Sequence, residues 1–151
     1  MVVGIERCHE NVHRLMAGAS LSFSRGLYAS ALMHTILAME EQGRKLVLCG
    51  AYMDGIELDE EWWKIMFRDH RAKIALSAIG YFAAKAQRKW LKTLRKIGSQ
   101  YQALKERSMY VTFDLQKNRW VHPGSITEKK ALAVLKEAKS FISTTDEMMS
   151  D

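Results

Sequence analysis

The sequence has one proline, two cysteines and no serine- and glycine-rich run. These shortages argue against flexible linkers. Cys8 and Cys49 form no spaced pair motif, which indicates the reduced thiols of a cytoplasmic protein rather than a disulfide scaffold. The longest stretch without Asp, Glu, Lys or Arg, residues 26–39, has 14 residues, fewer than the ~20 that a membrane helix requires. No apolar run follows a basic start, so we expect neither a signal peptide nor a membrane-spanning protein.

The 151 residues are 48% hydrophobic, which suits one folded domain over 1–151 and excludes a disordered chain. The net charge of +6 is unevenly distributed. Residues 64–107 contain 12 Lys or Arg and two Asp or Glu, whereas 1–63 carry a net charge of −4 and 108–151 are neutral. This concentration of positive charge indicates a polyanionic partner or an acidic partner surface.

Apolar residues recur at steps of three and four along most of the chain, a pattern typical of amphipathic helices. Between Met109 and Val121 the pattern alternates and predicts a short hairpin or extended loop. A capping box then opens a last helix that ends near Ser143, before a frayed tail. We therefore expect an all-α bundle of four or five helices, with this hairpin or loop before the last one. The other expected helices cover 5–23, 27–51, 60–68 and 69–107.

Two adjacent carboxylates form the first candidate site. Glu40 lies on or beside the apolar face of its helix, where a carboxylate needs a partner. The alternative is a solvent-exposed helix face without a functional role. There, Glu40 would pair with Arg44 and Glu41 with Lys45, each four residues later. Gly43 lowers helix propensity here, which suggests that another helix approaches closely.

His70 heads the second candidate site, since it shares a helix face with Lys73 and Ser77. A histidine among cations can act as a general acid or base. It can equally cap a helix or pack between helices. Nearby, we expect Trp62 and Trp63 to be packing residues rather than a base-stacking platform.

The segment His9-Glu10-Asn11-Val12-His13 matches the H-E-x-x-H pattern of zinc proteases. The extended downstream ligand pattern of those enzymes is absent, and only eight residues precede the motif. A helical bundle that binds two metal ions would need an E-x-x-H segment on each of two helices. The two E-x-x-H segments of this sequence lie in the same predicted helix. We therefore expect no metal or other cofactor, with adventitious metal binding as the alternative.

A basic stripe follows on the next expected helix, with cations at steps of three and four. Such a stripe can track phosphates, or it can be a solvated helix face. Arg68 and Arg71, beside His70, extend the set of candidate RNA contacts. The stripe consists of Lys85, Arg88, Lys89, Lys92, Arg95 and Lys96.

Three segments together resemble a known family. EEQGR at 40–44 resembles the E-E-x-G-K signature of AbiV-type abortive infection proteins, a branch of the HEPN superfamily. Residues 67–73 resemble that family's F-x-x-H-x-x-K stretch, and 110–131 resemble its C-terminal part. The resemblance extends from about Ile5 to Ala138.

The resemblance implies a helical HEPN-like domain, usually dimeric, that acts in phage defence. Many HEPN proteins are metal-independent ribonucleases with an R-x4-6-H motif, whose His and Arg activate the RNA 2′-hydroxyl and stabilise the phosphorane. The one literal match here runs from Arg7 to His13. Upstream of His70, Lys64 is the residue that can stand in for the arginine.

We therefore predict a cytoplasmic, homodimeric effector that acts on RNA and arrests host translation. Glu40, Glu41, His70 and Lys73 would form the catalytic site. RNA and a phage or antagonist protein are the expected partners. The alternative is a non-enzymatic helical protein that docks a protein partner through its basic face.

Overall fold

The computed structural model describes residues 1–79, 90–114 and 116–149. The helices, in chain order, are α1 (Val2–Ser24), α2 (Tyr28–Met53), α3 (Glu60–Arg68), α4 (His70–Ser77), α6 (Trp90–Met109) and α7 (Glu128–Met148). A two-stranded hairpin and a 3-10 turn lie between α6 and α7. The chain is thus the all-α bundle that we predicted, with six α-helices in the described ranges rather than four or five. None of these helices has the length and apolar character needed to cross a membrane.

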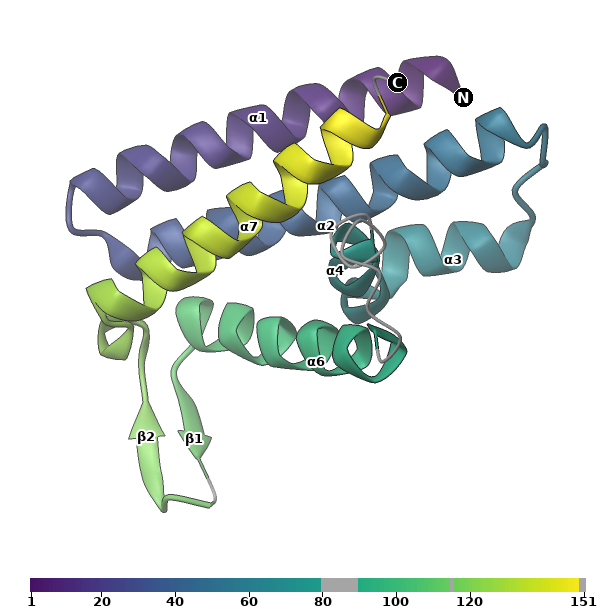
Figure 1. The fold of residues 1–151 in the computed structure, drawn as a ribbon. Coiled ribbons are helices and arrows are strands. Elements are labelled where there is room, and N and C mark those ends of the chain that lie inside the picture. The colour runs from purple at the N-terminus through teal and green to yellow at the C-terminus, as the bar shows by residue number, and fades with distance from the viewer. Residues whose placement is uncertain (80–89, 115, 150–151) are drawn as a thin grey trace.

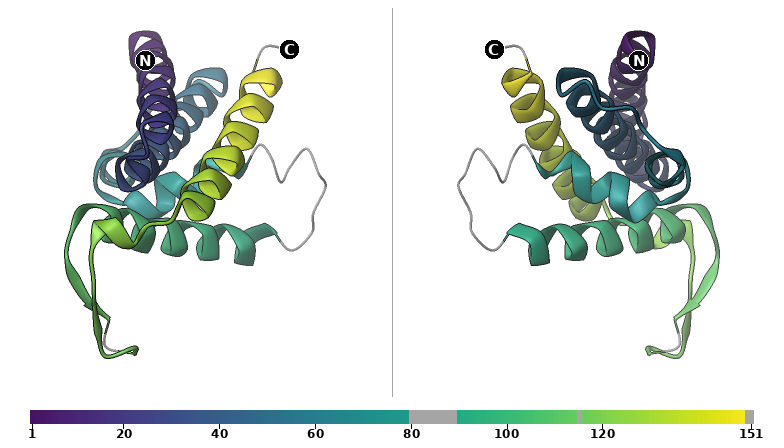
Figure 2. Two further views of the ribbon diagram at one scale, coloured as in Figure 1. Left: turned by 90° about the vertical axis from the view of Figure 1, so that its left-hand side faces the viewer. Right: turned by 90° about the vertical axis from the view of Figure 1, so that its right-hand side faces the viewer.

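Helices α1, α2 and α7 form one layer and α6 crosses beneath them, with α4 between (Figures 1 and 2). The turn from α1 into α2 contains Gly26, whose φ of +73° suits glycine. This confirms the predicted break between the first two helices.

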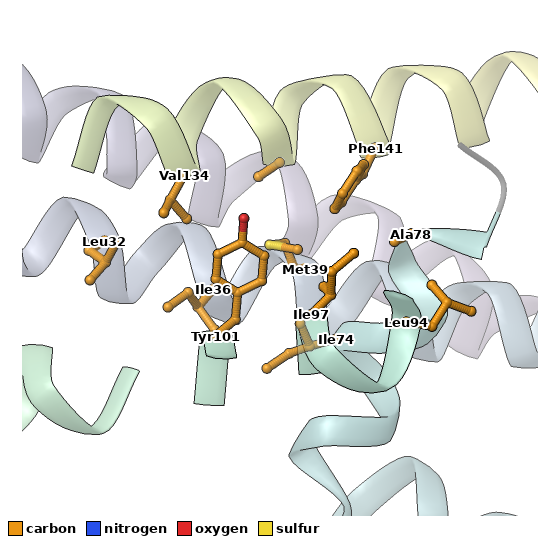
Figure 3. Packing of buried hydrophobic residues seen from close by; sticks show 11 residues of the cluster. Leu32, Ile36, Met39, Ile74, Ala78, Leu94, Ile97, Tyr101, Val134 and Phe141 are labelled. Carbon is orange, nitrogen blue, oxygen red and sulfur yellow. The ribbon is translucent and has the colours of Figure 1, made fainter. Parts of the chain in front are cut away.

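The main core lies where α2 meets α4, α6 and α7 (Figure 3). Leu32, Ile36 and Met39 form the fully buried stripe of α2. Phe141 approaches this stripe from α7, and Ile74 approaches from α4. The three-and-four periodicity of the sequence therefore does mark the buried face of the central helix.

Two glycines allow helices to cross closely. A Cβ on Gly43 would lie 1.9 Å from the backbone oxygen of Lys73. A Cβ on Gly98 would lie 2.4 Å from the backbone oxygen of Arg71. The close approach predicted at Gly43 is therefore confirmed, and the two contacts hold α4 between α2 and α6.

The single helix predicted over 69–107 is wrong. Helix α4 ends at Ser77 and α6 begins at Trp90, and the two helices pack against each other. Helix α7 also continues past Ser143 to Met148. Its last turns are held because Thr145 is buried and Asp146 bonds to α2, whereas periodicity alone gives no sign of these contacts.

The strands β1 (Thr112–Asp114) and β2 (Arg119–Val121) form the predicted hairpin, with Phe113 opposite Trp120. It projects from the helical body beyond one end of α6 (Figures 1 and 2). Trp120 is 69% exposed. Trp62 and Trp63 are 43% and 44% exposed, so the prediction that they belong to the core is wrong, although Trp63 lines a cavity together with residues of α1 and α2.

Candidate functional site

Glu40 is the centre of a charged cluster inside the bundle. Its side chain is 5% exposed, and α2 holds it on the apolar face, as its spacing indicated. Its Oε1 accepts a hydrogen bond of 2.6 Å from Nζ of Lys105, on α6. Its Oε2 lies 2.7 Å from Nδ1 of His70, the first residue of α4. A buried carboxylate is stable only with such partners.

Lys73 completes the cluster from below the surface. Its Nζ lies 3.8 Å from Oε2 of Glu40, and the residue is only 1% exposed. Burial lowers the pKa of Lys73, and the charge of Glu40 opposes that shift. Lys73 is therefore a buried counter-charge for Glu40 rather than a group that meets a ligand.

His70 connects this buried cluster with the surface, because its side chain is 44% exposed. Its Nδ1 also lies 3.3 Å from Nζ of Lys105. An ammonium only donates, so a single Nδ1 cannot bond to both partners. The shorter contact, to the carboxylate of Glu40, places a proton on Nδ1. In the neutral ring, Nε2 is then the proton acceptor.

A cavity of about 650 Å³ opens beside His70, between α3, α4 and α6. Asp69 lies in its wall, where it caps α4 by accepting a hydrogen bond from the backbone of Ala72. Glu106 is the other acidic residue of the lining. Lys64, Arg68 and Arg71 are cations of the lining.

A second, smaller cavity continues from the first, since both are lined by Asp69, Arg71 and Ser99. Arg95 of the predicted basic stripe lies in this second cavity. Lys96 is exposed on the same helix. The rest of the stripe lies outside the described residues: Lys85, Arg88, Lys89 and the side chain of Lys92.

Glu41 occupies a different place from Glu40. Its carboxylate pairs with Arg44 at 2.7 Å, and both side chains are largely buried. The pair contacts the thiol of Cys8. Burial, and to a lesser extent the charge of Glu41, raises the pKa of Cys8 to about 11. Glu41 thus lines a cavity between α1, α2 and α3 rather than the one beside His70.

The surface pairs considered for this part of α2 are not the ones that form. Glu40 bonds to Lys105 and His70, and Arg44 bonds to Glu41. Lys45 instead reaches Asp146 of α7, at 2.8 Å. The i,i+4 rule fails here because these side chains face neighbouring helices instead of solvent.

Lys105 is the residue of this cluster that sequence patterns did not single out. A signal for it was present, because Lys105 continues the buried stripe of α6 that includes Ile97 and Tyr101. A lysine on an apolar stripe needs a buried acidic partner, for the same reason that Glu40 needs a cation.

Comparison with protein families identifies the family to which this chain is similar. A model of the HEPN_AbiV family, described as AbiV, matches residues 1–143. The match spans the cluster around Glu40, the cavity beside His70 and most of α7. Comparisons with curated proteins and with solved structures gave no match.

Proposed function

The chain belongs to the HEPN_AbiV family, and from this premise we propose that it is a phage-defence effector of the abortive-infection type that cleaves RNA. One observation carries the proposal. His70 stands at the edge of a basic cavity, with its Nδ1 held by the buried carboxylate of Glu40. A histidine oriented by a carboxylate is a suitable general base.

The reaction needs one proton acceptor and a set of cations. Nε2 of His70 takes the proton of an RNA 2′-hydroxyl, and that oxygen attacks the adjacent phosphorus. The bond from phosphorus to the 5′-oxygen breaks, a water molecule protonates the 5′-oxygen, and the hydroxide that remains takes the proton back from Nε2 of His70. The products are a 2′,3′-cyclic phosphate and a 5′-hydroxyl. Glu40 stabilises the imidazolium that forms.

Arg68, Arg71 and Lys64 hold the phosphate in this scheme. Arginine suits this role because its planar guanidinium donates to two phosphate oxygens. Lys64 pairs with Glu60 at 2.9 Å on the surface, so it must exchange that partner for the phosphate. Arg95 extends the cationic path into the adjoining cavity.

The test is incubation of the EDTA-treated protein with total cellular RNA, beside His70→Gln and the matched control His13→Gln. General-base catalysis contributes about 10²- to 10⁴-fold, so cleavage by His70→Gln is expected to fall at least 100-fold. His13→Gln is expected to cleave like the wild type. Mapping of the products is expected to show cyclic phosphate ends, and circular dichroism checks that both variants fold.

Three results would count against this proposal. Full cleavage by folded His70→Gln would exclude His70 as the base. Loss of cleavage in His13→Gln alone would place the catalytic site at the R-x4-6-H match between Arg7 and His13. No cleavage and no salt-sensitive RNA binding by the wild type would favour the alternative, a non-enzymatic protein that docks a protein partner through its basic face.

Homodimerisation is part of the proposal. The exposed side chains of Tyr110, Val111 and Trp120 near the projecting hairpin support an assembly in which another chain covers them. Sedimentation equilibrium of the wild type is expected to give twice the chain mass. A monomer at all concentrations, or a dimer unaffected by Trp120→Ser, would contradict this part.

A further inference from the structure

The two histidines of the H-E-x-x-H segment lie on the surface of α1, with ring centroids 4.4 Å apart. The structure adds a third group that the sequence did not connect with them. Asp146 comes from the end of α7, and its Oδ2 lies 4.0 Å from Nε2 of His13. One ligand atom from each of His9, His13 and Asp146 lies within 4.8 Å of the others.

We propose that His9, His13 and Asp146 bind one divalent transition-metal ion of the Zn²⁺ type, for which the ammonium of Lys45 competes. Two imidazoles and one carboxylate suit Zn²⁺ better than Mg²⁺ or Ca²⁺, which prefer oxygen ligands. Ligands ~2.0–2.1 Å from a tetrahedral ion lie roughly 3.4 Å apart. The ligand atoms now lie within 4.8 Å of one another, so binding requires the two exposed histidine rings to rotate toward the ion.

The carboxylate is already oriented for this role. Oδ1 of Asp146 accepts hydrogen bonds from Nζ of Lys45 at 2.8 Å and from Nε2 of Gln42 at 3.1 Å. Gln42 is fully buried and Lys45 is nearly so, so α2 provides a rigid support. The neutral amide of Gln42 orients the carboxylate in the way that outer hydrogen bonds orient the carboxylates of metal sites, whereas Lys45 competes with the ion.

Lys45 contacts two of the three proposed ligands, so a metal ion must compete with its ammonium group. Its Nζ lies 3.0 Å from Nδ1 of His9. Since an ammonium carries only donors, this contact uses the lone pair of Nδ1. A metal ion that binds His9 through Nδ1 must therefore displace Lys45 from the ring. The positive charge of Lys45 also lowers the affinity for a divalent cation.

The motif's glutamate takes no part in the proposed site. Glu10 forms an exposed ion pair with Arg7, at 2.9 Å. The inferred site therefore connects α1 to the end of α7. It is also independent of the proposed RNA cleavage, because its test measures metal binding rather than activity.

The experiment is calorimetric titration of Zn²⁺ into the untagged, EDTA-stripped protein, with Co²⁺ absorption spectra as a second readout. One ion per chain is expected, with the visible bands of tetrahedral Co²⁺. Asp146→Asn keeps the shape of the side chain and is expected to weaken binding at least ten-fold. Its matched control is Glu147→Gln, the exposed acid next to it in α7, which is expected to bind like the wild type.

Lys45→Met separates this site from an ordinary histidine pair on a helix. Removal of the competing ammonium is expected to tighten Zn²⁺ binding at least ten-fold. Unchanged or weaker binding by folded Lys45→Met would overturn the competition. Equal affinity of Asp146→Asn and the wild type would overturn the three-ligand site. If Asp146→Asn fails to fold, His13→Gln, at an exposed position, tests the same three-ligand site, and wild-type affinity in that variant would overturn it.

Discussion

The Nζ atom of Lys105 lies 2.6 Å from Oε1 of Glu40, although 65 positions separate the two residues. Both side chains are almost fully buried. This contact joins α6 to α2 directly behind His70, which bonds to the other oxygen of the same carboxylate. The histidine that borders the basic cavity is thus held by an ion pair within the bundle.

Loss of the Glu40 charge is expected to destabilise the fold strongly. Glu40→Gln would leave Lys105 and Lys73 buried without their counter-charge. Removal of one partner from a buried ion pair costs about 3–5 kcal/mol. Urea unfolding followed by circular dichroism measures this change. Glu106→Gln, an exposed position in the same cavity wall, is expected to stay within about 0.5 kcal/mol; equal losses in both variants would refute the prediction.

The crossing of α2 and α4 at Gly43 gives a second stability prediction. Gly43→Ala would push a methyl group into the backbone of Lys73, and such overpacking costs about 3 kcal/mol. Gly50→Ala, in the same helix, is the control, because a Cβ at that position would meet no neighbouring atom within 4 Å. It is expected to stabilise the protein by up to ~1 kcal/mol. Similar melting temperatures for the two variants would contradict the close crossing.

The cavity beside His70 predicts how RNA binding responds to salt. If Arg68 and Arg71 each contact one phosphate, neutralising either should lower the slope of log affinity against log salt by ~0.7 for single-stranded RNA. Fluorescence anisotropy of Arg68→Gln and Arg71→Gln at several salt concentrations measures this slope. Lys129→Gln, on the exposed start of α7, is the control. An unchanged slope in both arginine variants would show that the arginines of the cavity do not contact RNA phosphates.

Cys8 is expected to react slowly with alkylating reagents. Its pKa is raised from 9.0 to about 11, first by burial and then by Glu41. Near pH 8, this shift lowers the thiolate fraction, and with it the rate, by about 100-fold. The rate should keep rising with pH beyond 9, because the thiolate fraction reaches one half only near 11. Iodoacetamide labelling of Cys49→Ser, folded and in urea, measures the rates; equal rates would contradict the prediction.

Much of the local structure could be predicted from sequence because it depends on neighbours in the chain. The span of α3 follows its acidic first turn, and the hairpin follows the alternation around Trp120. The burial of Glu40 follows from its place on an apolar stripe. The division between α4 and α6 could not be predicted in this way, since it depends on how the two helices pack together.

The pairing of the buried charged residues shows most clearly what the sequence determines and what the tertiary structure decides. Helical periodicity by itself indicates that Glu40 lies on or beside the apolar face of its helix. Which charges meet is decided by how α2, α6 and α7 cross, since glycine contacts and side-chain packing set those crossings. The tertiary structure therefore pairs Glu40 with Lys105 and His70, and it brings Asp146 to Lys45 and the histidines of α1. A charged group inside a protein bonds to the partner within reach, and reach is a property of the packed helices rather than of spacing along the chain.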